Sequence, residues 1–226
     1  MIWTIHPPGR LVLWGAGAGS AFAGGLAAAA AARGGVALGA NCDLGPGVVV
    51  KFGSQSAHLR VFGTLAVQGT ASEPVTFTSL KDDSVGGDAN NDLGATTPAP
   101  GDWGSILVDG GSVTLTHAVL RFGGSGAFAG TFLIANLVVE GGTASVADSR
   151  LEQAGIHNVR LTAGSLAIAR TEIAAASSGN GVLIDGGTAV IGQSSIRDNR
   201  GFGVFAATGT LDLASTTSTR NFGAVF

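Results

Sequence analysis

The sequence predicts an all-β protein whose short strands coil into a parallel β-solenoid. Glycine supplies 38 of the 226 residues and only 12% of residues are charged, a balance unusual for a helical or α/β enzyme. A glycine-centred segment also recurs about every 22 residues through the second half of the chain. Apolar residues alternate with small or polar residues on both sides of that glycine, which is the period of a strand.

The repeat aligns on five small turns: DGGSVTL, EGGTASV, TAGSLAI, DGGTAVI and ATGTLDL. Their glycines, at successive spacings of 31, 22, 23 and 22 residues, are Gly111, Gly142, Gly164, Gly187 and Gly209. Each copy holds three short apolar runs, so each predicts three strands. A unit of this size cannot bury its apolar face alone, and stacking successive units buries a continuous core.

The alignment predicts which side chains point inward. The residues four positions after each aligned glycine form one inward column: Leu115, Val146, Ile168, Ile191 and Leu213. Asparagine supports the stack, because Asn158 and Asn180 are 22 residues apart, as are Asn199 and Asn221. Asparagine tolerates a left-handed backbone and can bond along stacked turns.

Earlier segments extend this pattern, namely GPGVVVKFG, LRVFGTLAVQGTASEPVTFTS, KDDSVGGDANND and GDWGSI. With them, residues 44–226 resemble the right-handed parallel β-helix repeat proteins of the pectate-lyase-like (pectin lyase-like) superfold. The resemblance implies a right-handed coil, here of about seven rungs, and an exported bacterial protein found outside the cell or on its surface. It implies no activity, since this fold carries lyases, hydrolases, adhesins and passive stalks.

The first 42 residues have a different composition from the rest. Arg10 and Arg33 are their only Lys or Arg side chains, and between these lies the run LVLWGAGAGSAFAGGLAAAAAA. Three interpretations stay open: a signal peptide, a membrane anchor, or an Ala/Gly-rich helical cap on the solenoid. We therefore divide the chain into an N-terminal apolar segment, 1–42, and a β-helix, 43–226, with an inserted loop at 81–103.

That loop, KDDSVGGDANNDLGATTPAPGDW, gathers oxygen-bearing side chains in a chain that is otherwise poor in charge. Calcium prefers carboxylate and amide oxygens, so the loop predicts a structural Ca²⁺ site. Leu93 stands where an EF-hand loop requires glycine, which excludes that motif. A solvated acidic loop is the alternative. The predicted ligands are Asp82, Asp83, Asp88, Asn90, Asp92 and Asp102.

One outward column contains candidate catalytic residues. Asp109, Glu140 and Asp185 each stand two residues before an aligned glycine. Like charges on adjacent rungs raise one pKa or recruit a cation, as an acid/base pair or a Ca²⁺-assisted lyase requires. In the alternative interpretation Arg160, on the same face, neutralises Glu140 and Asp185 within a structural ion network.

Beside this column lies a predicted ligand-binding surface. Its residues are Trp103, Leu107, Val138, Leu183 and Phe205. It is either a bare docking ridge or a ridge covered by loop 81–103 or by the N-terminal segment. Elsewhere, outward charges are expected to pair between rungs, and the predicted pairs are Arg121 with Glu152, Asp148 with Arg170, and Arg150 with Glu172.

These features favour a non-catalytic exported module that binds a polysaccharide or a surface protein. A carbohydrate-active enzyme, either a polysaccharide lyase or a glycoside hydrolase, is the alternative, and a spacer fragment of a longer stalk is the second. A net charge of −3 provides no basic surface for nucleic acid. The last residues, RNFGAVF, carry no polar cap, which predicts end-to-end self-association through the C-terminal rung or continuation in a longer solenoid.

Overall fold

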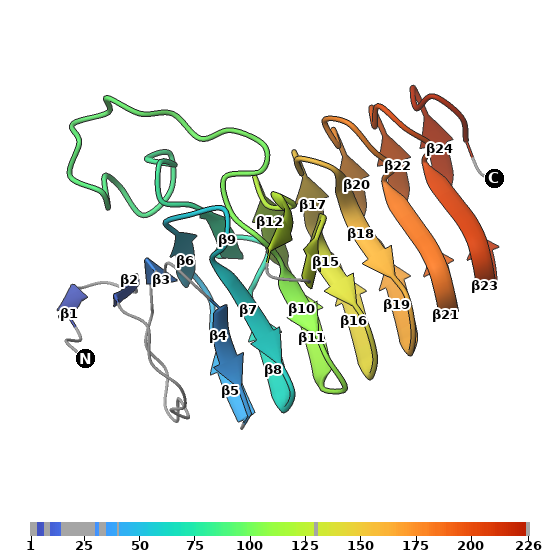
Figure 1. Cartoon of the computed structure of the whole chain (residues 1–226), viewed down its shortest axis with the longest axis horizontal. Coiled ribbons are helices and arrows are strands. Elements are labelled where there is room, and N and C mark those ends of the chain that lie inside the picture. Colours follow the sequence, from blue (N-terminus) through green and yellow to red (C-terminus); the bar gives the residue numbers. More distant parts are fainter. Residues whose placement is uncertain are drawn as a thin grey trace.

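The structure is a computed structural model that describes residues 4–6, 10–14, 30–31, 35–39, 41–128 and 131–224. These ranges contain strands and turns and no helix. Parallel ladders join strands that are about one repeat apart in sequence. The protein is therefore all-β and forms a parallel β-solenoid, as the sequence predicts (Figure 1).

Each coil of the solenoid contributes one strand to each of three faces. The first face contains β4 (Gly35–Leu38), β7 (His58–Val61), β10 (Ile106–Val108), β15 (Ala135–Val139) and β18 (His157–Leu161). The second contains β5 (Asn41–Leu44), β8 (Thr64–Gln68), β11 (Ser112–Thr116), β16 (Thr143–Ala147) and β19 (Ser165–Ala169). Two longer strands, β21 (Val182–Gly192) and β23 (Val204–Ala214), run through the corner between these faces and join them into one sheet.

The third face is a separate parallel sheet. Its strands are β6 (Val49–Phe52), β9 (Val75–Ser79), β12 (Ala118–Arg121), β17 (Arg150–Glu152), β20 (Glu172–Ala174), β22 (Ser195–Arg197) and β24 (Thr217–Thr219). At its N-terminal side this sheet also contains β1 (Thr4–His6), β2 (Arg10–Trp14) and β3 (Ala30–Ala31). A small antiparallel hairpin, β13 (Gly126–Phe128) with β14 (Thr131–Leu133), lies outside both sheets.

The predicted inward column is confirmed by the strand register. Leu115, Val146, Ile168, Ile191 and Leu213 are successive Cα partners across the second face. The first four are at most 2% exposed, whereas Leu213 is partly buried. The difference arises because each of the first four is covered on both sides, while β23 pairs with β21 on one side.

Left-handed backbone turns the chain at each corner. At the corner of the aligned repeat glycines, Gly142, Gly164, Gly187 and Gly209 have φ between 75° and 92°. A Cβ atom on Gly164 would lie 2.3 Å from the carbonyl oxygen of Gly142 in the coil beside it, so this corner requires glycine. Other corners have more room, and residues such as Asp148 and Arg170 adopt positive φ there.

Buried amides link the coils through a side-chain ladder. The Nδ2 groups of Asn136, Asn158 and Asn199 each donate to the Oδ1 atom of the next asparagine, ending at Asn221, over 2.9–3.0 Å. Asn180, which the sequence places in this stack, lies outside the ladder and accepts a hydrogen bond from the backbone N–H of Phe202. The Asn136 amide, 22 residues before Asn158, takes part instead.

Residues 15–29, the centre of the predicted signal peptide, anchor or helical cap, lie outside the described residues. The described parts of the N-terminal segment are strands. β4 pairs with β7 and β5 pairs with β8, so the parallel faces already include residues 35–42. The structure has, in the ranges it describes, no helix with the length and apolar character that a membrane span needs.

Candidate functional site

Loop 81–103 is fixed to the solenoid by a buried cation. Lys51 on β6 is 1% exposed, and its Nζ donates 2.6 Å hydrogen bonds to the carbonyl oxygens of Asp82 and Gly87. Asp82 is also buried, and it forms a 2.5 Å ion pair with Arg121 on β12. Burial on its own would raise the pKa of Asp82, but hydrogen bonds from Ser84 and Thr78, together with Arg121, lower it.

The other end of the loop is held by Asp102. Its carboxylate accepts hydrogen bonds from the Ser79 hydroxyl at 2.8 Å and from the Ala99 backbone N–H at 2.9 Å, and it forms a 2.8 Å ion pair with Lys81. Two predicted metal ligands, Asp82 and Asp102, are thus engaged by the solenoid and the loop ends. The structure does not bring them into the carboxylate cluster at the loop centre.

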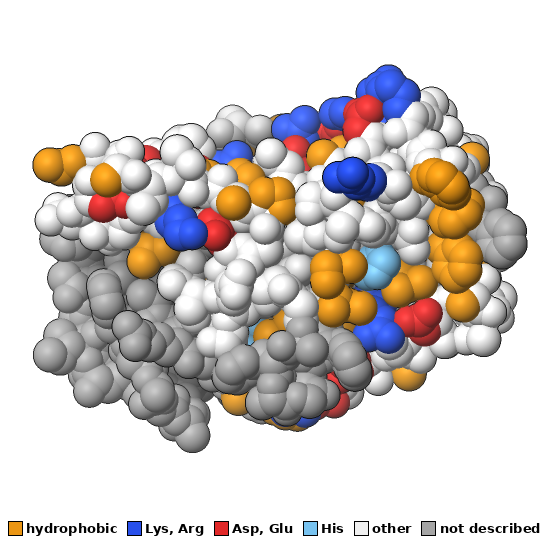
Figure 2. Space-filling model, turned by 45° about the horizontal axis from the view of Figure 1, so that its top comes forward, with side chains coloured by type: hydrophobic (Ala, Val, Ile, Leu, Met, Phe, Trp, Pro, Cys, Tyr) orange, Lys and Arg blue, Asp and Glu red, His pale blue; other side chains and the backbone are white. Residues whose placement is uncertain are grey.

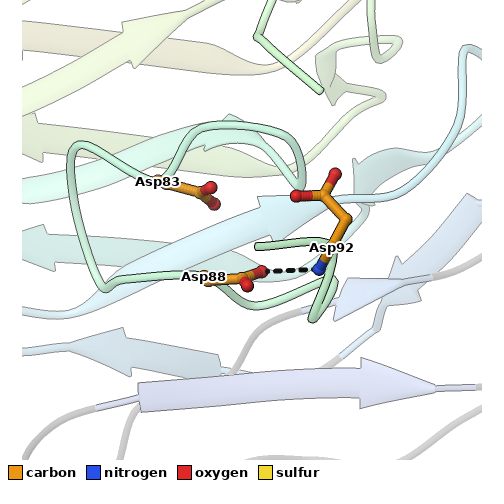
Figure 3. A group of neighbouring side chains, drawn as sticks. All are labelled: Asp83, Asp88 and Asp92. Atoms are coloured by element: carbon orange, nitrogen blue, oxygen red, sulfur yellow. Dashed lines mark hydrogen bonds between the residues drawn. The ribbon is translucent and has the colours of Figure 1, made fainter. Parts of the chain in front are cut away.

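That cluster consists of Asp83, Asp88 and Asp92, which the structure does bring together (Figure 3). One carboxylate oxygen of each lies within 4.8 Å of the other two. Asp88 accepts hydrogen bonds from the backbone N–H groups of Asp92 and Leu93 at 3.2 and 2.9 Å. Three negative charges at this separation repel one another, which favours a cation among them.

Hydrogen bonds within the loop fix the orientation of Asp92. Its oxygens accept from the backbone N–H groups of Gly94 and Ala95 at 2.8 and 3.0 Å and from the Asn90 amide at 2.6 Å. The Thr96 hydroxyl makes the largest contribution to lowering the pKa of Asp92, and these hydrogen bonds add to it. Asp92 is therefore ionised near neutral pH.

Two oxygens at the cluster are buried without a hydrogen-bond partner among the described residues. They are Oδ1 of Asp83 and Oδ1 of Asn90. A buried acceptor without a partner costs about 1–3 kcal/mol, and a hard cation would satisfy it. The donor set is all oxygen, which fits Ca²⁺ and does not suit a softer transition metal.

The outward column of the first face divides into a covered and an uncovered part. Leu107 and Val138 are Cα partners and are fully buried, packed with Leu133 of β14 and with Ala135. The hairpin side of the molecule covers this ridge, so these two residues do not form the predicted ligand-binding surface. Sequence alternation identified the face correctly but could not show that Leu133 returns onto it.

Trp103 is also buried, contrary to the prediction that it binds a ligand. Its ring stacks on Phe52, with centroids 4.2 Å apart and an interplanar angle of 10°, and its Nε1–H donates to the carbonyl oxygen of Arg121 at 2.8 Å. A fully buried indole presents no face to solvent. It serves instead to attach the end of loop 81–103 to the core.

Leu183 and Phe205 continue the same column beyond Arg160 and are partly exposed. Phe205 adjoins Phe202, and Phe202 in turn contacts the edge of Phe222, with centroids 5.5 Å apart in both pairs. Phe222 is 80% exposed. Hydrophobic side chains gather toward this end of the molecule (at the right in Figure 2), which makes it the best candidate among the described residues for a docking surface.

The candidate catalytic carboxylates are mostly neutralised by arginine. Asp109 accepts from Nε of Arg60 at 2.8 Å and forms an ion pair with it. Arg160 donates from Nε to Asp185 at 2.8 Å. Glu140 follows β15 beside Asp109 and is partly buried, and it forms no ion pair within the described part of the chain. Arg60 was missed because the sequence alignment began one copy later.

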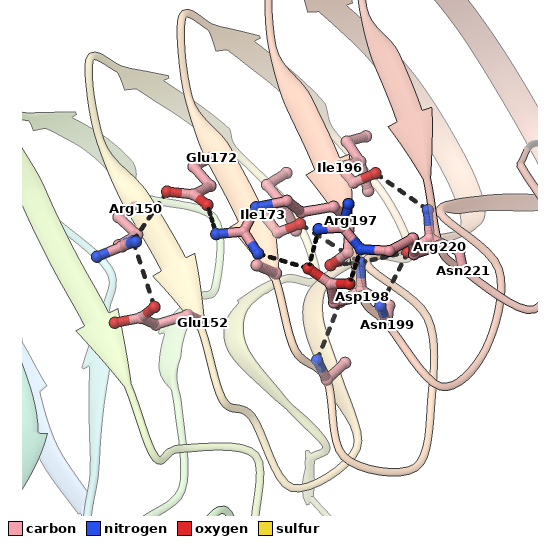
Figure 4. Close-up of polar contacts among 12 residues, drawn as sticks. Arg150, Glu152, Glu172, Ile173, Ile196, Arg197, Asp198, Asn199, Arg220 and Asn221 are labelled. Atoms are coloured by element: carbon pink, nitrogen blue, oxygen red, sulfur yellow. Dashed lines mark hydrogen bonds and ion pairs between the residues drawn. The ribbon is translucent and has the colours of Figure 1, made fainter.

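The third face carries an alternating ladder of charges (Figure 4). Arg150 pairs with Glu152 and Glu172, Arg197 pairs with Glu172 and Asp198, and Arg220 pairs with Asp198. The predicted pair of Arg150 with Glu172 is confirmed, as is that of Arg170 with Asp148 at 2.7 Å. The predicted pairing of Arg121 with Glu152 is wrong, because Arg121 turns toward Asp82 in the loop.

Comparison with known proteins supplies no assignment. A scan against protein-family models, a search of curated proteins and a search of solved structures each find no match to this chain.

Proposed function

We propose that the protein is a non-catalytic β-solenoid module that binds a glycan or a surface protein outside the cell. The finer architecture in this proposal is a right-handed, pectin lyase-like β-helix of about seven rungs. The observation that carries the proposal is charge compensation of the outward column: Arg60 holds Asp109 and Arg160 holds Asp185. Such a face suits recognition better than proton transfer.

Proton transfer by a carboxylic acid needs a pKa raised toward the working pH. The carboxyl groups whose pKa values shift here all shift downward, and these are Asp82, Asp92, Asp148 and Asp198. They remain ionised and cannot donate a proton near neutral pH. Only Glu140, which lacks an ion pair among the described residues, supports the alternative of a polysaccharide lyase or glycoside hydrolase.

Within this proposal, loop 81–103 binds one structural Ca²⁺. Asp83, Asp88 and Asp92 supply carboxylate oxygens, and Asn90 supplies an amide oxygen. The close approach of the three carboxylates supports this assignment, as do the two buried oxygens without partners. The role of the ion is to neutralise the cluster and to hold a long loop in one conformation.

A panel of acidic and neutral polysaccharides tests binding and cleavage together. Affinity electrophoresis measures retention of the purified chain, while reducing ends and unsaturated products report hydrolysis and elimination. We expect retention by at least one polysaccharide without product, weakened by Phe205→Ala and unchanged by Phe62→Ala. Product formation that Glu140→Gln abolishes would establish the enzyme instead. Neither retention nor product across the panel would reject glycan recognition and leave the protein partner.

A further inference from the structure

Strand β23 presents an open edge. Its register with β21 runs from the Val182–Val204 pair to the Gly192–Ala214 pair, and the structure shows no second strand beside it in the residues it describes. The backbone N–H groups of Gly203 and Val204 are bonded to the carbonyl oxygens of Gly223 and Ala224, so only the start of β23 is covered. The edge from Phe205 to Ala214 is the open part.

The core is also open at this edge. Ala206, Leu211 and Leu213 are partly buried, although their register partners on β21 are fully buried. Next to them, Phe222 is 80% exposed and lies edge-on to Phe202. β23 contains no lysine or proline, the residues that commonly protect an exposed edge from pairing.

We propose that two copies of this chain associate tail to tail through the β23 edge and Phe222. The surface is continuous with the ladders that already join one coil to the next, so a second strand finds the same backbone groups and the same apolar column. The inference is independent of glycan binding and goes beyond it, because it concerns the end of the solenoid and not its outward face.

The opposite end of the third-face sheet favours this tail-to-tail geometry. There β6 is already paired with β2 and β3, and β2 with β1, so that sheet edge is occupied. The C-terminal edge is therefore expected to meet its own copy, with the two β23 strands antiparallel. Such an interface is isologous and closes at a dimer.

Sedimentation equilibrium over a wide concentration range provides the first measurement. The mass is expected to rise from 22.2 kDa to about twice that value and to stop there. Phe222→Asp should raise the dimer dissociation constant about tenfold or more, because it places a charge in the apolar contact. The matched change Phe62→Asp, at a 47% exposed ring on an early coil, should leave it unchanged.

Hydrogen–deuterium exchange then locates the interface. Raising the concentration through the dimer midpoint should slow exchange of the amides of residues 207–213 and leave exchange in β16 unchanged. A monomer at every concentration would overturn the proposal, as would growth without limit beyond a dimer. Dimerisation with unaltered exchange in β23, or with equal effects of the two Phe→Asp variants, would place the contact elsewhere and reject it as well.

Discussion

The side-chain amide of Asn158 donates a 3.0 Å hydrogen bond to Oδ1 of Asn199, although 41 residues separate the two along the chain. Asn158 is fully buried, accepts a hydrogen bond from Asn136 at 3.0 Å and donates to the carbonyl oxygen of Ala174 at 2.8 Å. Every link of this ladder thus depends on its neighbours for a partner.

Asn158→Ala should lower the free energy of unfolding by about 2–4 kcal/mol, since it leaves buried groups of Asn136 and Asn199 without partners. Urea denaturation measures the change. Asn180→Ala is the matched control, because Asn180 is partly buried and its side chain accepts one backbone hydrogen bond, so a loss of about 1 kcal/mol is expected. Equal losses in the two variants would contradict the importance of the ladder.

Ile168→Ala should cost about 2–5 kcal/mol through lost burial and the cavity left between two coils. Ile168 is 2% exposed and is stacked between Val146 and Ile191. Val190→Ala, on the same strand as Ile191 but 47% exposed, should change stability by about 0.5 kcal/mol or less. Thermal and urea unfolding of both variants provide the comparison, and a tolerated Ile168→Ala would show that this column is not the core.

Acid should destabilise the protein through His157. Burial, helped by nearby Arg160, lowers the pKa of His157 to about 4, and its Nδ1 accepts a 2.9 Å hydrogen bond from the backbone N–H of Asn180. The unfolded state, with a pKa of about 6.5, binds the proton more readily. The stability from this group is therefore complete above about pH 6.5 and decreases as the pH falls toward 4.

The expected loss from His157 between pH 7 and pH 5 is about 2 kcal/mol. His157→Asn keeps an acceptor near the Asn180 N–H but cannot take up a proton in this range. Urea denaturation at the two pH values should therefore show a smaller difference for the variant than for the parent. An identical pH dependence in both proteins would assign the acid sensitivity to other groups.

Calcium should stabilise the protein through loop 81–103. A free Ca²⁺ concentration about 100-fold above the dissociation constant adds about 2.7 kcal/mol and raises the melting temperature relative to a chelator control. Asp88→Asn with Asp92→Asn should abolish this rise, whereas Asp43→Asn, at an exposed position on β5, should preserve it. Equal melting curves in calcium and chelator would leave a solvated acidic loop.

The solenoid could be predicted because its repeat is written in local rules. Gly164 and Gly187 mark a corner where the neighbouring backbone leaves no space for a side chain, and Ile168 follows at a fixed distance along an alternating strand. Spacing alone was enough to give the strand register. It could not identify the partner of Arg121, because Asp82 reaches it from a loop whose path no periodicity describes.

The candidate site was predicted in composition but only partly in arrangement. Asp83, Asp88 and Asp92 converge, whereas Asp82 and Asp102 are used to fasten the loop. The missed element is Lys51, whose charged end lies under the loop although its strand reads as buried. A lysine between Val50 and Phe52 was the available signal, since a buried lysine requires partners supplied by another segment.

The ladders between coils also determine how the molecule responds to mechanical force. Their hydrogen bonds point from coil to coil, so a pull on opposite ends of the stack loads them one coil at a time and in the direction in which they separate. Each coil of about 22 residues that peels away adds roughly 75 Å of extended chain. Stretched between two attachment points, the protein would therefore lengthen in equal steps, as a graded extensible tether.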